Sequence, residues 1–128
     1  MNILALDYGR KNIGLAWCQE ALGVVLPYGK IINHKSKIKN FIDLIKKERI
    51  DLVVIGLPLG LDGKENENTK NVRAFGEVLK SEVRVPISYV DERFSSHAAD
   101  RFGAEGASRD EKAAMVILQG YLDSRKKS

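Results

Sequence analysis

The apolar run at residues 52–57, Leu-Val-Val-Ile-Gly-Leu, limits the fold of this chain more than any other feature. Apolar and polar positions do not alternate in it, which is typical of a strand covered on both faces. Pro58 then removes a backbone donor and ends the strand. The run therefore predicts a central strand in a sheet that is covered by helices, as in α/β proteins.

Apolar segments earlier in the chain predict three more strands. Residues 3–6 and 13–18 flank a glycine-containing turn at 9–12, and such a short link favours an antiparallel hairpin. A third strand is expected at 24–32. These three strands precede the first segment with helical periodicity, so we expect them to pair with one another in antiparallel fashion.

The rest of the chain is predicted to alternate between helices and strands. A helix follows Ser36, a suitable N-cap, and a second spans about 69–80 before a strand at 85–90. A short helix is expected at 96–102, and the last helix begins after Ser108, where Ser-Arg-Asp-Glu has the capping-box pattern. This order predicts an α/β fold with a mixed five-stranded sheet: three antiparallel strands, then parallel β-α-β units, flanked by helices.

Length and charge restrict the class of protein. The 128 residues fit one domain, so we expect residues 1–128 to form a single domain. The first apolar run is too short for an export signal or a membrane span, and the lone Cys18 fits a reducing compartment, so a cytoplasmic protein without membrane association is expected.

The net charge of +4 weakly favours polyanionic partners. Residues 30–49 hold seven bases against two acids, which fits a nucleic-acid surface or merely the solvated face of a helix.

Acidic residues lie where predicted strands end or a helix begins. Asp7 follows the first strand, Asp91 and Glu92 end the fifth, and Asp110 lies in the first turn of the last helix. Each alone has an ordinary explanation, such as turn chemistry or the helix dipole. Together they indicate a metal site, because Mg²⁺ takes oxygen ligands and two-metal phosphodiester hydrolysis needs several carboxylates.

Four motifs occur in order along the chain: Asp7-Tyr-Gly-Arg-Lys-Asn-Ile-Gly-Leu-Ala, Gly56-Leu-Pro-Leu-Gly-Leu-Asp-Gly-Lys-Glu, Asp91-Glu-Arg-Phe-Ser-Ser and Asp110-x-x-Ala-Ala-x-x-Ile-Leu-Gln-x-Tyr-Leu. Through them the chain closely resembles the YqgF family, also called RuvX, over essentially its whole length. The resemblance implies an RNase H-like fold, similarity to Holliday junction resolvases, and nuclease processing of the 5′ end of pre-16S rRNA.

The resemblance also implies roles for individual acids. Asp7, Glu92 and Asp110 correspond to the catalytic carboxylates and would hold one or two Mg²⁺ or Mn²⁺ ions, with Asp91 as the less favoured alternative to Glu92. In many RNase H-like nucleases the second acid ends the fourth strand. Here that strand ends in Gly-Leu-Pro at 56–58 without an acid, so Glu92 would have to reach in from the fifth strand.

Basic residues beside these acids are the expected contacts to nucleic acid. Arg10 and Lys11 follow Asp7 and Arg93 follows Glu92, so all three could touch phosphates, although exposed cations need no function. The expected partners are structured RNA or a branched DNA such as a four-way junction, bound by a monomer or a homodimer. Two other classes stay open: a non-catalytic nucleic-acid adaptor and an actin-like nucleotide phosphotransferase.

Overall fold

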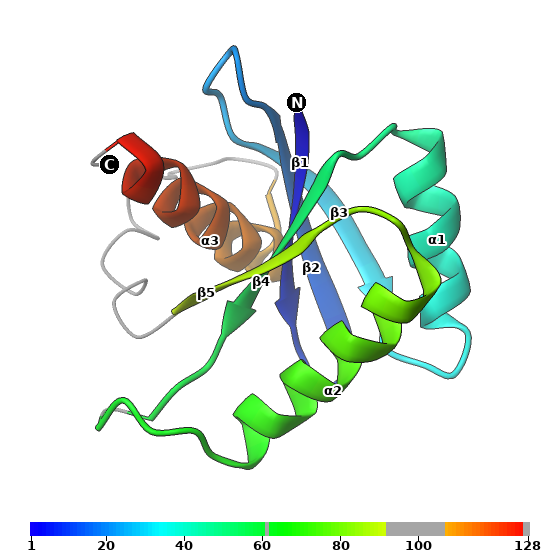
Figure 1. Cartoon of the computed structure of the whole chain (residues 1–128), viewed down its shortest axis with the longest axis vertical. Coiled ribbons are helices and arrows are strands. Elements are labelled where there is room, and N and C mark those ends of the chain that lie inside the picture. The colour runs from blue at the N-terminus through cyan, green and yellow to red at the C-terminus, as the bar shows by residue number, and fades with distance from the viewer. Residues whose placement is uncertain (61, 92–106, 127–128) are drawn as a thin grey trace.

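The computed structural model describes residues 1–60, 62–91 and 107–126. The predicted helix at 96–102 lies outside the described residues. The elements follow the chain as β1 (Asn2–Tyr8), β2 (Asn12–Gln19), β3 (Leu26–Ile32), α1 (Lys37–Lys47), β4 (Leu52–Leu57), α2 (Glu67–Glu82), β5 (Ile87–Asp91) and α3 (Arg109–Lys126) (Figure 1).

In the described part of the chain, the strands form a five-stranded mixed sheet in the order β3-β2-β1-β4-β5 (Figure 1). β1 pairs antiparallel with β2, and β2 antiparallel with β3. β4 lies parallel between β1 and β5. This arrangement confirms the predicted fold class. β4 also has the predicted internal position, and all six of its residues are buried.

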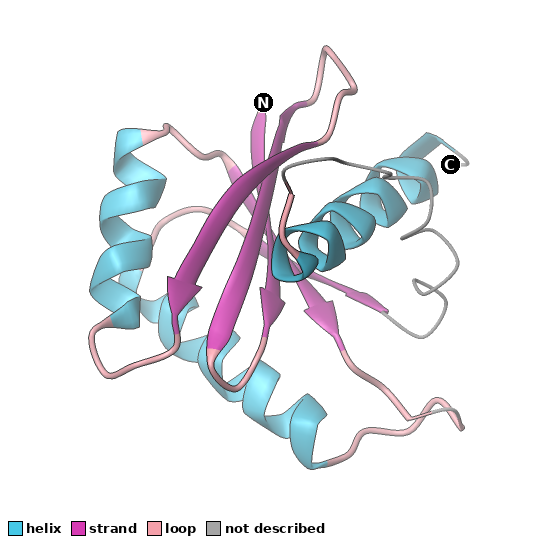
Figure 2. Cartoon of the chain, turned by 180° about the vertical axis from the view of Figure 1, so that it is seen from behind, coloured by secondary structure: helices cyan, strands magenta, loops and turns pink. Residues whose placement is uncertain are grey.

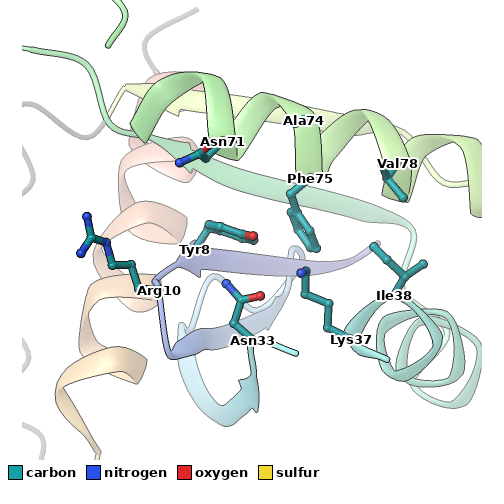
Figure 3. Close-up of a pocket in the computed structure, with 9 residues that line it drawn as sticks. All are labelled: Tyr8, Arg10, Asn33, Lys37, Ile38, Asn71, Ala74, Phe75 and Val78. Carbon is teal, nitrogen blue, oxygen red and sulfur yellow. The ribbon is translucent and has the colours of Figure 1, made fainter. Parts of the chain in front are cut away.

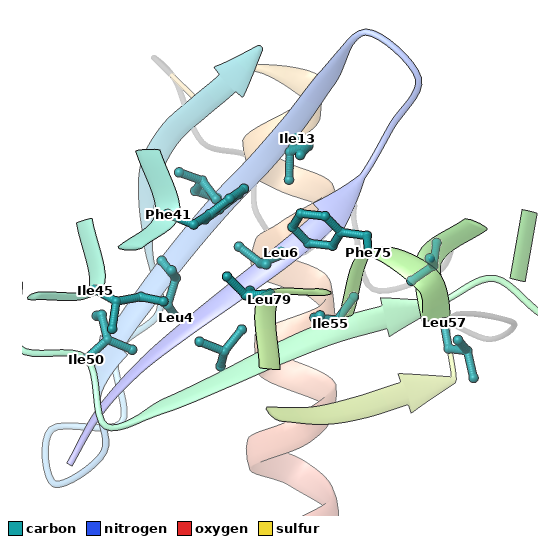
Figure 4. Packing of buried hydrophobic residues seen from close by; sticks show 13 residues of the cluster. Leu4, Leu6, Ile13, Phe41, Ile45, Ile50, Ile55, Leu57, Phe75 and Leu79 are labelled. Carbon is teal, nitrogen blue, oxygen red and sulfur yellow. The ribbon is translucent and has the colours of Figure 1, made fainter. Parts of the chain in front are cut away.

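Helices cover both faces of this sheet (Figures 1 and 2). α1 and α2 pack on one face, where Phe41 and Phe75 meet Leu4 and Ile55 in a buried cluster (Figure 4). We call this the α1/α2 face. Residues alternate between the two faces along each strand, so the neighbours of Leu4 and Ile55 in the sequence point the other way.

Among the described helices, α3 covers the opposite face, which we call the α3 face (Figure 2). There Ile117 and Leu118 of the helix pack with Ala5 of β1 and Val54 of β4. The odd-numbered residues of β1 therefore face α3, as do the even-numbered residues of β2 and β4. None of the helices in the described part of the chain could span a bilayer, because none is both long and apolar enough.

Several element boundaries differ from the sequence predictions. β5 begins at Ile87 rather than at residue 85, and local hydrogen bonds fix two other boundaries. The third strand begins at Leu26 rather than at residue 24, since the Leu22 and Gly23 amides both donate to the Gln19 carbonyl oxygen and hold a turn there. α2 begins at Glu67 rather than at about 69. Asn66 caps it through a reciprocal capping box with Thr69, an arrangement that satisfies two backbone donors.

Of the two serines predicted to cap helices, Ser108 forms capping hydrogen bonds through its side chain and Ser36 does not. At Ser108 the predicted capping box is confirmed: the Glu111 amide donates to Ser108 Oγ at 3.2 Å and the Ser108 amide to Glu111 Oε1 at 2.9 Å. Ser36 does precede α1, but its side chain makes no capping hydrogen bond. Its backbone lies at φ −92° and ψ 7°, outside the extended conformation usual for an N-cap.

Candidate active site

Asp7 is the penultimate residue of β1, and its side chain belongs to the α3 face. The alternation along β1 requires this, because Ile3 and Ala5 pack in the cluster beneath α3. Its partner across the antiparallel pair is Gly14 of β2. Residues directly opposite each other in such a pair point to the same face with Cβ atoms about 5 Å apart, so position 14 leaves open space beside the Asp7 carboxylate.

The first turn of α3 occupies that space. A Cβ atom at position 14 would overlap the Asp110 carbonyl oxygen and lie 3.0 Å from Asp110 Cβ. Only glycine lets helix and strand approach this closely. Gly14 therefore lies next to both Asp7 and Asp110 on the α3 face. Both acidic residues are half-buried. The structure brings together these two of the predicted catalytic acids.

Glu111 fixes the start of α3 next to Asp110. Its carboxylate accepts a hydrogen bond from the Ser108 amide, which is the main reason that the pKa of Glu111 lies below the usual value for glutamate. The Gly29 amide and the charge of Lys30 lower this pKa further. Burial acts in the opposite direction. Because Gly29 and Lys30 belong to β3, these interactions connect the beginning of the helix with the sheet and orient the turn that carries Asp110.

This lowered pKa gives a stability prediction for Glu111→Gln. Glutamine still fits a capping box but has no charge. The charged form contributes stability above the unfolded-state pKa of about 4.3, and this contribution is lost as the pH falls through the lower folded-state value. We therefore expect wild type to exceed the variant in unfolding free energy at pH 7 and the difference to shrink towards pH 3. Urea denaturation at both pH values measures it, and a difference that does not change with pH would contradict the assignment.

The second acidic position is only partly described. Glu92 and Arg93 lie outside the described residues. Asp91 is the last residue of β5 and pairs with Leu57. Two residues earlier, Tyr89 packs with the cluster under α1 and α2, whereas Val90 packs with the cluster under α3. Alternation therefore places Asp91 on the α1/α2 face, opposite to Asp7.

Arg10 and Lys11 lie in the turn between β1 and β2, next to Asp7, and both are exposed. Asn33, which directly follows β3, holds this turn in place. Its side-chain amide donates to the Gly9 carbonyl oxygen at 2.8 Å, and its backbone amide donates to the Lys11 carbonyl oxygen at 2.8 Å. The two cations therefore project from a fixed turn at the same end of β1 as the Asp7 carboxylate.

Carboxylate oxygens are the donors that Mg²⁺ and Mn²⁺ prefer, so Asp7 and Asp110 fit such an ion chemically. Among residues 1–60, 62–91 and 107–126, no group of three acidic, histidine or cysteine side chains is close enough to hold a metal. The described part of the site thus provides a pair of carboxylates. A third acidic, histidine or cysteine ligand would have to come from outside it.

Two residues that shape the site were not recognised as functional in the sequence. Gly14 lies inside a predicted strand, and an isolated glycine there often marks a close backbone approach, so a signal was present. Asn33 carries no such signal. Its importance depends on the contact between the end of β3 and the turn after β1, two segments about 24 residues apart.

Comparison with known proteins agrees with this fold. Residues 1–124 match the RuvX family, described as Holliday junction resolvase. A protein of Dictyoglomus turgidum named "Putative pre-16S rRNA nuclease" is 38% identical over 135 residues, covering 97% of this chain and 95% of that protein. A protein of the same name from Rickettsia africae is 35% identical, covering 97% of this chain and 87% of that protein.

Solved structures show the same fold. The T. thermophilus RuvC in complex with a Holliday junction substrate superposes with a TM-score of 0.68 at 17% identity, covering 98% of this chain and 96% of that one. The fowlpox virus Holliday junction resolvase gives a TM-score of 0.62 at 13% identity, covering 97% and 99%. The fold is therefore that of the RNase H-like nucleases. This chain belongs to the RuvX family.

Proposed function

We propose that this protein is a divalent-metal-dependent nuclease that processes the 5′ end of pre-16S rRNA. The observation that carries the proposal is the convergence of Asp7 and Asp110 across Gly14 on the α3 face. Two half-buried acidic residues that lie next to the same glycine form a site for a hard cation. The substrate is proposed from the names of the relatives, which cover nearly the whole chain.

In this proposal Asp7, Asp110 and Glu92 are the catalytic carboxylates that hold one or two Mg²⁺ or Mn²⁺ ions. Bound ions would activate water for attack on phosphorus and stabilise the leaving oxygen, so the protein needs no nucleophilic side chain. Glu92 is preferred to Asp91 because Asp91 lies on the α1/α2 face, away from Asp7. The capping box at Ser108 and Glu111 holds Asp110 in position.

Positively charged residues would position the substrate. Arg10 and Lys11, on the turn fixed by Asn33, are proposed to contact phosphates beside the scissile one, together with Arg93. Such contacts give affinity and register without sequence preference. Specificity for a precursor end would then depend on other surfaces. A substrate of this kind implies a cytoplasmic location, and we propose that the chain acts as a single domain.

A cleavage assay tests the proposal. The wild-type protein is incubated with a 5′-end precursor of 16S rRNA, a four-way DNA junction and a plain duplex, each in Mg²⁺, Mn²⁺ or EDTA. We expect cleavage of the precursor with either ion and none in EDTA. Failure to cut any of the three substrates would contradict the nuclease assignment, and hydrolysis of ATP in its place would favour a phosphotransferase. Binding without cleavage would favour an adaptor.

The second candidate substrate is the four-way DNA junction, which the description of the RuvX family favours. Symmetric cleavage of a junction requires two active sites, so a resolvase is expected to be a homodimer. A nuclease that trims an RNA end can act as a monomer. Junction cleavage in the same assay, together with a dimeric mass in solution, would support this alternative over the rRNA precursor.

A further inference from the structure

A groove lies on the α1/α2 face beside the end of β1, on the opposite side of the sheet from Asp7 and Asp110. It has a volume of about 470 Å³, within the range of small-molecule sites, which is about 300–1,000 Å³. Tyr8, the neighbour of Asp7 in β1, lies at its base, and α1 and α2 form its walls (Figure 3). Asp7 of the carboxylate pair and Tyr8 of the groove are thus the last two residues of one strand.

Aromatic and apolar side chains form the inner part of the groove. The ring of Phe75, which is almost fully buried, supports the ring of Tyr8 at a centroid distance of 4.8 Å and an interplanar angle of 40°. Val78 is exposed at the far end of the groove (Figure 3). A half-buried tyrosine supported from one side is a suitable platform for a flat ring, because base–aromatic stacking tolerates any base.

Polar and cationic groups surround this platform. Lys37 Nζ lies over the Tyr8 ring, 5.9 Å from its centroid, and Arg10 lines the other end of the groove (Figure 3). Asn71 of α2 and Asn33 add two amides, and the Asn33 amide group already donates to the Gly9 carbonyl oxygen, which leaves its oxygen as an acceptor. Among the described residues that line the groove, none is acidic.

This combination favours one occupant. An apolar peptide offers no charge for the two cations and no donor for the free side-chain oxygen of Asn33, whereas a nucleotide offers a flat base, hydrogen-bonding base edges and a phosphate. A duplex exposes its base faces only at its ends, so the matching ligand is an unpaired nucleotide. We propose that the groove between α1 and α2 binds an unpaired nucleotide of the substrate, with its base against Tyr8 and its phosphate near Lys37 and Arg10.

This inference rests on the proposed function, since it assigns the groove to the same nucleic acid that the carboxylates would cut. Tyr8 and Asp7 are consecutive residues whose side chains point to opposite faces of the sheet. A nucleic-acid strand that passes the end of β1 therefore meets both Asp7 and Tyr8. A single-stranded segment of a precursor RNA could be held in the groove while a neighbouring phosphate lies at the acids, which would select substrates with unpaired nucleotides at the cut.

The test is a binding experiment in EDTA, so that it does not depend on cleavage. The probe is a single-stranded RNA octamer that contains 2-aminopurine, whose emission falls when it stacks on an aromatic ring. We expect quenching by wild type, and about tenfold weaker binding by Lys37→Ala, because a phosphate contact is lost. The matched control is Lys47→Ala at the exposed far end of α1, which we expect to bind within about twofold of wild type.

A second pair of variants checks the groove from α2 without removing a cation. Asn71→Asp places a negative charge of nearly the same shape in the wall, and we expect about tenfold weaker binding. Asn68→Asp makes the same change at an exposed position of α2 that does not line the groove, and we expect little effect. All four positions are at the surface, and thermal melting confirms that each variant folds.

Three results would overturn the proposal: no quenching with wild type, equal losses in a groove variant and its matched control, or equally tight binding of a blunt RNA duplex. Equal losses would mean that the basic surface attracts RNA without using the groove. The proposed function is judged separately. If the wild-type protein binds the octamer but cuts no substrate, the groove assignment stands and the nuclease assignment is rejected.

Discussion

Asp7→Asn is expected to lower the rate of RNA cleavage by at least about a hundredfold, because it removes the charge of a carboxylate on which the bound cation depends. Asn keeps the size of the side chain and the packing of β1 against α3. The same loss is expected for Asp110→Asn, since both residues lie next to Gly14 on the α3 face. Single-turnover cleavage of the precursor in Mg²⁺ measures both effects.

Asp43→Asn is the matched control for these variants. Asp43 is an exposed residue of α1 on the other side of the sheet, so its loss should leave the rate unchanged. Thermal melting of all three proteins separates a loss of catalysis from a loss of folding. Cleavage by Asp7→Asn and Asp110→Asn at the wild-type rate would show that these carboxylates are not the catalytic groups.

Gly14→Ala is expected to reduce both stability and cleavage. The added methyl group overlaps a backbone carbonyl oxygen of Asp110, which cannot rotate away as a flexible side chain would. Overpacking of this kind costs about 1–3 kcal/mol of unfolding free energy. The first turn of α3 must also move away from β2, which separates Asp110 from Asp7. Urea denaturation gives the first effect, and the cleavage rate of the folded variant gives the second.

Gly120→Ala provides the same chemical change in α3 without the overlap. No atom lies within 4 Å of a Cβ placed there, and alanine is favoured over glycine in a helix by up to about 1 kcal/mol. We therefore expect this variant to be slightly more stable and fully active. A Gly14→Ala protein as stable and active as Gly120→Ala would mean that the close contact between β2 and α3 does not position the acids.

The sheet could be predicted because its signals are local. The unbroken apolar run at 52–57 indicates a strand with both faces covered, and the capping box at Ser108 marks the start of α3. Where signals compete, the sequence is less informative. Ser36 stands at the predicted cap position, yet its amide donates to His34 Nδ1 and its hydroxyl makes no capping bond.

The site could be predicted only in part, because a sequence shows which residues end strands but not which of them meet. The motifs identify Asp7 and Asp110, whereas the contact that joins them depends on the missing side chain at Gly14. The face of Asp91 follows from alternation once the position of Tyr89 is known. The groove combines residues of β1, α1 and α2, so no single segment contains its pattern.

The proposed nuclease activity depends most on whether Asp7 and Asp110 jointly hold a divalent cation. Mn²⁺ titration followed by electron paramagnetic resonance tests it directly, with wild type, Asp7→Asn, Asp110→Asn and the Asp43→Asn control. We predict that wild type and control bind Mn²⁺ with equal affinity and that each of the other two variants binds at least about tenfold more weakly. Equal Mn²⁺ affinity in all four proteins would contradict the claim.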